Sequence, residues 1–363
     1  MMTHLTLIVP FSVPPGTGDD DPEGVMSAAL LRQLELPALG KLLTRASPGA
    51  RERHDDPYLR SLPHERWLAG RAGLDTARVP SAPFMRLADG GSADEQAWAC
   101  LELVHIHAAR DHLVLMDPAR LGVRASEAEA LHRALDALLG ESGIRLEALA
   151  PGRWYLAEAV FGPLEATTPL RATGRNIDIW MQEGERARDW RRLQNEIQMT
   201  WFDHPVNQAR EAAGELPINS VWLHGGGRLQ AVPRLADAVY TDDPFAAGLA
   251  LAAGAARQPL PAGLAALADG GSALALLDAA AEAHIGQDWG RWLDAMHGLE
   301  DAWFAPALAA LESGRCEALT VVLAGENHFA EFRVTRGDLR KFWRGLGSRG
   351  DWRALLSDLA LAA

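Results

Sequence analysis

Cysteine is scarce in this sequence, because Cys100 and Cys316 are the two cysteines among 363 residues. Two thiols are too few for a disulfide framework, and an isolated cysteine usually behaves as a small buried hydrophobe. A chain of this length buries about three quarters of its unfolded surface, so it does not need disulfide bonds to fold. We therefore expect two buried free thiols and a reducing compartment, the cytoplasm.

Long apolar runs are also lacking. The run 5–9 is too short for a secretion signal, and prolines rather than a cleavage site follow it. No run reaches the roughly 20 apolar residues that a bilayer-spanning helix needs. The stretch 246–268 comes nearest, but glycine, proline and Arg257 interrupt it. The sequence thus predicts neither a secretion signal nor contact with a membrane.

Positive charge is in deficit, with 35 Lys and Arg against 48 Asp and Glu, for a net charge of −13. Such a surface repels the phosphate backbone of nucleic acids, so we expect no nucleic-acid partner. Hydrophobic residues make up 48% of the chain and charged residues 23%. This balance is typical of a globular protein and excludes a largely disordered chain.

Strand and helix patterns alternate near both ends of the chain. Short buried strands are predicted at 5–9, 273–277 and 319–323. Between the end regions, 95–170 follows the order strand, strand, helix, strand, and 126–129 has the spacing of a capping box led by Ser126. We therefore predict an α/β fold in which 1–94 and 171–363 build one discontinuous sheet domain. A smaller α+β domain, 95–170, is inserted into it.

A dense polar cluster precedes a glycine-rich turn within 203–227. Arginine supplies a forked donor, asparagine supplies neutral hydrogen bonds, and glycine lets backbone N–H groups approach an anion. The predicted ligand-binding residues are His204, Asn207, Arg210, Asn219, His224, Gly225 and Gly226. The alternative is a structural network in which His204-Pro205 ends one helix and Asn207 caps the next. The turn is not a P-loop, since no Gly-Lys-Ser/Thr follows it.

Carboxylates and imidazoles in the last third of the chain are candidate metal ligands. Such groups at the ends of strands are what a di-metal phosphoesterase uses to bind its cations. The candidates are Asp278, His284 and His328. A structural role is the stronger interpretation for each, so we expect no metal or cofactor and assign no catalytic residue. The tryptophans at helical spacing in 289–303 are predicted to pack in the core.

The residue order in 204–219 resembles the archaeal-type, cofactor-independent phosphoglycerate mutases of the alkaline phosphatase superfamily. Their His-Pro-x-Asn…Arg…Gly-x-x-Pro-x-Asn run has its counterpart here, from His204 through Arg210 to Asn219. The chain is also similar to a bacterial branch of phosphoglycerate mutase-like, or RpfE-like, regulatory proteins. The resemblance implies an alkaline-phosphatase-like sheet domain with an inserted domain, and a phosphorylated ligand.

The chain departs from the mutase pattern at the positions that carry the chemistry. Catalytic members have Asp-Gly after the first strand, where the Asp binds metal, but 9–12 reads Val-Pro-Phe-Ser. Their nucleophilic Ser or Thr falls before the counterpart of Trp67, where 62–65 reads Leu-Pro-His-Glu. Their late Asp-His metal pair aligns with Asn327-His328. The resemblance therefore implies a degenerate active site without covalent phosphoryl transfer.

Three functions follow as hypotheses. The leading one is a regulatory or ligand-binding protein that recognises an anionic, phosphorylated metabolite. The first alternative is an active mutase or phosphomonoesterase that uses Mn²⁺ or Zn²⁺, with Asp19, Asp20 or Asp21 replacing the missing metal aspartate. The second alternative is a protein-interaction subunit with the tryptophan-rich helices as its contact surface.

Overall fold

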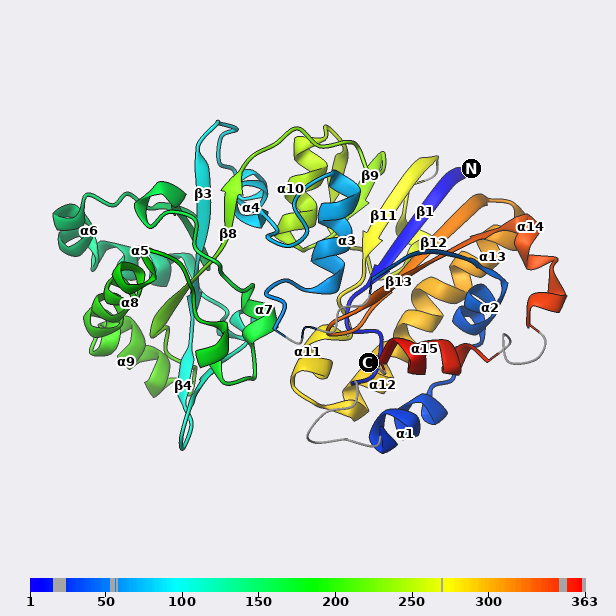
Figure 1. The fold of residues 1–363 in the computed structure, drawn as a ribbon, viewed down its shortest axis with the longest axis horizontal. Coiled ribbons are helices and arrows are strands. Elements are labelled where there is room, and N and C mark those ends of the chain that lie inside the picture. The colour runs from blue at the N-terminus through cyan, green and yellow to red at the C-terminus, as the bar shows by residue number, and fades with distance from the viewer. Residues whose placement is uncertain (16–23, 53–55, 57, 269, 346–350, 361–363) are drawn as a thin grey trace. The chain divides into compact units, whose positions relative to one another are not determined.

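The computed structural model describes residues 1–15, 24–52, 56, 58–268, 270–345 and 351–360 (Figure 1). The chain forms two compact units, which are described separately. Unit 1 comprises Met1–Leu59, Pro63–Ala72 and Pro233–Ala363, and unit 2 comprises Arg60–Leu62 and Gly73–Val232. The chain therefore passes from one unit to the other several times.

Unit 1 combines a large sheet with helices. Its strands are β1 (Met2–Val9), β2 (Ser47–Glu52), β9 (Ala238–Tyr240), β10 (Ala256–Gln258), β11 (Gly271–Leu276), β12 (Cys316–Ala324) and β13 (Phe329–Thr335). Its helices are α1 (Val25–Gln33), α2 (Pro37–Arg45), α3 (Pro63–Ala72), α10 (Pro244–Ala252), α11 (Ala281–Ile285), α12 (Trp289–Leu299), α13 (Ala305–Ser313), α14 (Arg336–Leu339) and α15 (Trp352–Ala360).

The sheet of unit 1 has the strand order β10-β9-β11-β1-β12-β13-β2. The strands from β10 to β12 run parallel, whereas β13 and β2 are antiparallel to their neighbours. β1 lies in the middle, where Leu7 pairs with Ala275 on one side and Val321 on the other. The predicted α/β fold is confirmed, and β1, β11 and β12 cover the three predicted buried strands.

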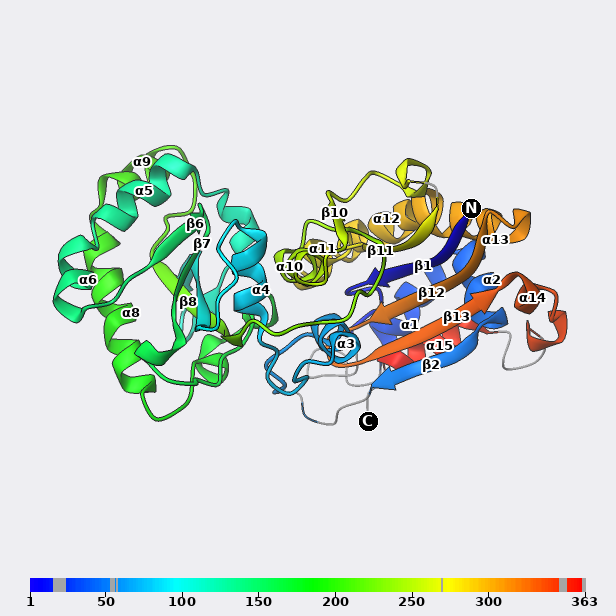
Figure 2. The ribbon, with the colours of Figure 1, turned by 90° about the horizontal axis from the view of Figure 1, so that it is seen from above.

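An apolar core lies between this sheet and the helices α1, α2, α12, α13 and α15 (Figures 1 and 2). Leu5, Leu7 and Val9 of β1 belong to this core, because every second side chain along a strand points to the same face. Trp292, Met296 and Trp303 are buried in it, which confirms the prediction that the tryptophan stripe is core. These side chains are therefore not the exposed contact surface that the protein-interaction hypothesis requires.

Unit 2 is built on a four-stranded sheet of order β6-β7-β3-β8 and a hairpin of β4 and β5. Its strands are β3 (Ala97–Val104), β4 (Ile106–Ala108), β5 (Leu113–Leu115), β6 (Glu147–Ala150), β7 (Arg153–Ala157) and β8 (Ser220–Arg228). Its helices are α4 (Ser81–Ala88), α5 (Ala125–Arg133), α6 (Asp136–Ser142), α7 (Pro169–Ala172), α8 (Ala187–Phe202) and α9 (Pro205–Ala212). One sheet face packs on α5 and α8 in an apolar core, and α4 contacts β3 and β8.

Two boundaries in unit 2 differ from the sequence expectation. The unit extends beyond 95–170, because β8 pairs along β3 and brings α8 and α9 with it. The start of α5 lies two residues earlier than predicted: Arg124 is the N-cap, and the Glu127 carboxylate accepts the Arg124 backbone N–H at 2.9 Å. Ser126 lies inside α5, and Glu129 pairs with Arg133 instead.

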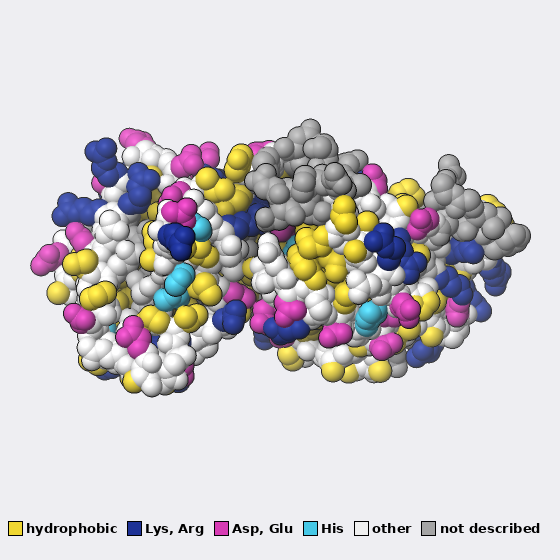
Figure 3. Space-filling model, turned by 90° about the horizontal axis from the view of Figure 1, so that it is seen from below, with side chains coloured by type: hydrophobic (Ala, Val, Ile, Leu, Met, Phe, Trp, Pro, Cys, Tyr) yellow, Lys and Arg dark blue, Asp and Glu magenta, His cyan; other side chains and the backbone are white. Residues whose placement is uncertain are grey.

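Both predicted thiols are confirmed as free and buried. Within the described part of the chain, no helix is long and apolar enough to cross a membrane. Basic and acidic side chains are interspersed on the face shown in Figure 3.

Candidate functional site

The carboxyl end of β1 is where the mutase resemblance places a metal-binding aspartate. The turn at this strand end contains Phe11, with 3% of its surface exposed. Its backbone has a φ of 53°, in the left-handed region that residues with a side chain rarely adopt. The indole N–H of Trp292 donates a hydrogen bond of 2.8 Å to the Phe11 carbonyl, which helps to hold this turn.

Two imidazoles flank the Phe11 ring. Ring centroids lie 5.2 Å apart for Phe11 and His284, and 6.4 Å apart for Phe11 and His64. Burial, followed by the guanidinium of Arg66, lowers the pKa of His64 to about 3, so this imidazole is neutral at pH 7. His64 lies in the segment where the resemblance predicts the nucleophile, so this segment and the turn after β1 are in contact in the fold.

The hydroxyl of Ser12, next to Phe11, is fully buried. It donates a hydrogen bond of 2.8 Å to the carbonyl of Val9, its own strand end. Ser12 therefore closes the turn after β1 rather than presenting a nucleophile.

The three predicted metal candidates do not form one ligand set. His284 Nε2 lies 3.1 Å from the Val13 carbonyl oxygen, and Nδ1 lies 3.9 Å from a Glu326 carboxylate oxygen. Asp278 follows β11, where burial, and then the nearby Asp242, raise its pKa. His328 is buried before β13. Among the described residues, the one convergent group of three potential ligands lies elsewhere, in unit 2.

The aspartates proposed as replacement ligands, Asp19, Asp20 and Asp21, lie outside the described residues.

In unit 2, the predicted ligand-binding residues His204 and Asn207 hold the connection between α8 and β8. His204 is the N-cap of α9 and accepts the Val206 N–H at 3.2 Å. The Asn207 amide donates to the carbonyls of Trp201 and Ile218, both at 2.9 Å, and accepts the Ile218 N–H at 2.8 Å. Both side chains thus make the helix-end network that the sequence offered as the alternative interpretation.

The guanidinium of Arg210 is enclosed in the same region, with 1% of the side chain exposed. It donates to a Glu127 carboxylate oxygen at 2.8 Å and to the Leu216 carbonyl at 2.7 Å, and it also contacts the Leu121 carbonyl. Arg210 therefore ties α9 to α5 and to the chain on either side of them.

The remaining predicted residues lie further along the chain. Asn219 exchanges two hydrogen bonds with the backbone of Ile106, at 2.8 and 2.9 Å. His224 is five residues later, about 16 Å along an extended strand, so the seven predicted residues do not surround one ligand. They divide into the structural network at 204–219 and a second group at the end of β8.

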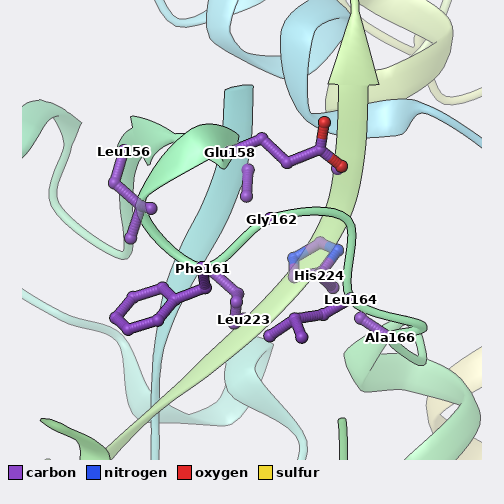
Figure 4. A pocket seen from close by; sticks show the side chains of 10 residues that line it. Leu156, Glu158, Phe161, Gly162, Leu164, Ala166, Leu223 and His224 are labelled. Carbon is purple, nitrogen blue, oxygen red and sulfur yellow. The ribbon is translucent and has the colours of Figure 1, made fainter. Parts of the chain in front are cut away.

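This second group borders a small pocket (Figure 4). His224 and Gly226 line it together with Glu158, while Leu156, Phe161 and Leu164 supply apolar walls. Glu158 forms an ion pair with Arg78.

Gly225 and Gly226 lie where neighbouring segments pack closely against β8. A Cβ on Gly225 would lie 2.3 Å from Ser81 Oγ, and one on Gly226 would lie 2.6 Å from a Glu158 carboxylate oxygen. The glycines therefore let α4 and the 158–160 turn approach β8.

Cys100 and Glu102 were not among the predicted site residues, yet they share a sheet face with His224. The ligand atoms of the three lie within 4.8 Å of one another. The sequence alone predicts that Cys100 and Glu102 share a face, since Cys-x-Glu on a strand places both side chains on one side. It does not predict the position of His224, which depends on the pairing of β3 with β8, more than 100 residues later.

No family model matches the chain. The chain is similar to the 2,3-bisphosphoglycerate-independent phosphoglycerate mutase of Methanosarcina mazei, with 28% identity over 166 residues, 44% of this chain and 38% of that protein. A probable mutase of the same description from Geobacter sulfurreducens is 27% identical over 165 residues, 44% and 39% of the two chains. The match spans about two fifths of the length of these curated relatives. The predicted resemblance to cofactor-independent phosphoglycerate mutases is confirmed.

Two solved structures resemble the whole chain. The cofactor-independent phosphoglycerate mutase from Thermoplasma acidophilum has a TM-score of 0.47 and 19% identity, covering 99% of this chain and 100% of that one. A protein from Pyrococcus horikoshii has a TM-score of 0.51 and 13% identity, covering 92% and 87%. The second likeness shows a shared fold.

Proposed function

We propose that this chain is a phosphoglycerate mutase-like protein that works by binding an anionic, phosphorylated metabolite, in a regulatory role, and not by metal-dependent phosphoryl transfer. One observation carries the proposal, which is the Phe11 ring at the carboxyl end of β1, next to His64 and His284.

The residues at this position do not fit the metal pair that the resemblance implies. A divalent metal in a phosphoryl-transfer site is held by carboxylates and imidazoles about 2.0 to 2.2 Å away. Phe11 offers no ligand atom, and its ring occupies the place beside His284. His64, in the nucleophile segment, has no hydroxyl. We therefore derive no catalytic step through a metal at this edge of the sheet.

The class of metabolite comes from the relatives, whose names specify phosphoglycerate as the compound they act on. In this chain the motif residues His204, Asn207 and Arg210 contact the protein itself. These contacts position the start of β8, the strand that carries His224. His224 is the predicted residue that reaches a pocket.

The test is a calorimetric titration of the chelator-treated protein with 3-phosphoglycerate, paired with a turnover assay in the presence of Mn²⁺. We expect saturable binding without turnover. Turnover would overturn the proposal in favour of an active mutase, and the Asp19→Ala/Asp20→Ala double variant would then be expected to abolish it. If neither binding nor turnover is observed, 3-phosphoglycerate is excluded as the ligand.

A further inference from the structure

Cys100, Glu102 and His224 form a compact cluster on one face of the unit 2 sheet. Cys100 and Glu102 are two residues apart on β3, and His224 is the direct partner of Cys100 on β8. Direct cross-strand partners have Cβ atoms about 4.5 to 5.5 Å apart, close enough for both side chains to bind one ion. This arrangement of two ligands on one strand and a third on its neighbour is fixed by backbone pairing.

The spacing of the ligand atoms suits a small tetrahedral ion. The thiol sulfur, a carboxylate oxygen and an imidazole nitrogen all lie within 4.8 Å of one another. Bonds of about 2.0 to 2.3 Å in a tetrahedral zinc site place ligand atoms about 3.3 to 3.8 Å apart. Small side-chain rotations therefore bring the three atoms to bonding positions without moving the strands.

The imidazole of His224 supplies an independent observation. Its ring is 3% exposed, and Nε2 lies 3.1 Å from a Glu102 carboxylate oxygen. Nδ1 is buried, and no hydrogen-bond partner for it occurs within the described part of the chain. Buried polar atoms without a partner are uncommon in native proteins, and a bound water or ion is one way in which they are satisfied. Within the described part of the chain, the hydrogen-bonding capacity of this imidazole is therefore incomplete.

The charges around the cluster match a divalent cation. Arg153 on β7 donates two hydrogen bonds to Asp89 at the end of α4, at 2.7 and 2.9 Å, so this pair is neutral overall. Tyr155, the β7 partner of Cys100, donates to the same Asp89 at 2.6 Å. Glu102 therefore supplies one uncompensated negative charge, and a Cys100 thiolate would supply a second.

We propose that Cys100, Glu102 and His224 bind a divalent cation that prefers sulfur and nitrogen ligands, above all Zn²⁺. Binding breaks the S–H bond of Cys100, forms a sulfur–metal bond and releases one proton to solvent. Oxygen-preferring cations such as Mn²⁺ are disfavoured by the thiolate and the imidazole. The site lies in unit 2 and shares His224 with the pocket described above. It requires no phosphorylated metabolite, so its test succeeds or fails separately from that of the proposed function.

Proton release gives the site a defined pH dependence. Burial, followed by the Glu102 carboxylate, raises the pKa of the Cys100 thiol, while Arg153 acts in the opposite direction. The groups that face the thiol are Glu102, His224, Tyr155, Arg153 and Asp89. Because the cation displaces a thiol proton, its affinity increases with pH.

The test uses Co²⁺ as a spectroscopic probe, added to the reduced, chelator-treated full chain. Because the cluster is buried, Co²⁺ is added both to the folded protein and during refolding from urea. We expect one equivalent to produce a sulfur-to-cobalt charge-transfer band that Zn²⁺ abolishes and Mn²⁺ does not. Cys100→Ser removes the band, and Glu102→Gln and His224→Gln weaken binding about tenfold or more.

Cys316→Ser is the matched control, because it removes the other buried thiol, in unit 1, and leaves the band unchanged. Circular dichroism establishes that each variant is folded, and the two conservative variants provide the result if Cys100→Ser fails to fold. The proposal is overturned if neither protocol produces the band, or if the band persists in Cys100→Ser and disappears in Cys316→Ser.

Discussion

The ring centroids of Phe11 and His284 lie 5.2 Å apart, at the carboxyl end of the central strand of unit 1. An aromatic contact therefore forms in the turn after β1, where the backbone of Phe11 is in the left-handed region.

Two truncations of Phe11 separate the effect of its ring from the effect of its strained backbone on stability. Phe11→Ala removes the ring and lowers the free energy of unfolding by about 3 to 5 kcal/mol. Phe11→Gly also removes the strain of a positive φ, so we expect it to be at least as stable as Phe11→Ala. Phe84 in α4 is the control, because there the glycine variant is the less stable by about 1 kcal/mol. Urea unfolding measures both pairs, and the same order at both sites would contradict the backbone argument.

His64 makes stability depend on pH. Its pKa is about 3 in the folded protein, against 6.5 for an unperturbed imidazole, because burial disfavours the charged form. Between these values the unfolded chain binds a proton that the folded chain does not, so His64 lowers the free energy of unfolding progressively as the pH falls from 6.5 towards 3. Above 6.5 the group has no effect.

In His64→Gln we therefore expect the unfolding free energy to decline less between neutral pH and about pH 4 than in the wild type. Equal slopes in His64→Gln and the wild type would contradict the prediction.

Arg210 tests whether the 204–219 network is structural. Arg210→Ala leaves the Glu127 carboxylate in a buried site without this partner, so we expect a loss of about 3 to 5 kcal/mol. Arg192→Ala breaks an exposed pair with Glu196, at 3.0 Å, and is expected to change stability by about 0.5 kcal/mol or less. Thermal and urea denaturation provide the comparison, and similar losses in both variants would show that Arg210 is not enclosed.

Gly225 tests the close approach of α4 to β8. Its φ is 69°, and a Cβ there would meet Ser81 Oγ and, at 2.8 Å, the backbone nitrogen of Ala82. Gly214 has a φ of 74°, but a Cβ there would meet nothing within 4 Å. Both alanine variants incur backbone strain, and we expect Gly225→Ala to lose about 1 to 3 kcal/mol more because of the clash. Differential scanning calorimetry measures the loss of stability in the two variants. Equal losses would contradict the prediction, because they would mean that α4 can move away from β8 at little cost.

The central strands of unit 1 were predictable because burial on both faces produces short, continuous apolar runs, as at 5–9 and 319–323. The start of α5 was misplaced because Ser126 has the chemistry of a cap, whereas the N-cap is Arg124, whose backbone N–H donates to Glu127. The extent of unit 2 was missed because it depends on the register between β3 and β8, which alternation within one strand does not encode.

For the site residues, too, the sequence predicted local features but not the contacts between segments that are distant in sequence. Local chemistry identified Asn207, Arg210 and His224 as notable, but their partners come from elsewhere in the chain, such as Glu127 for Arg210. The spacing of Cys100 and Glu102 was visible, whereas their relation to His224 is a product of strand pairing. Similarly, Phe11 could be recognised as a departure from the mutase pattern, but its proximity to His64 required the fold.

The strand order of unit 1 has a consequence for synthesis of the chain. Both neighbours of β1 begin at or after Gly271, so β1 has no strand partner until synthesis has passed that residue. At 5 to 20 residues per second, this interval lasts about 13 to 50 s. The strands of unit 2 all lie between Ala97 and Arg228, so this sheet can be completed earlier. During that interval the apolar side chains of β1 need protection from other unfolded chains.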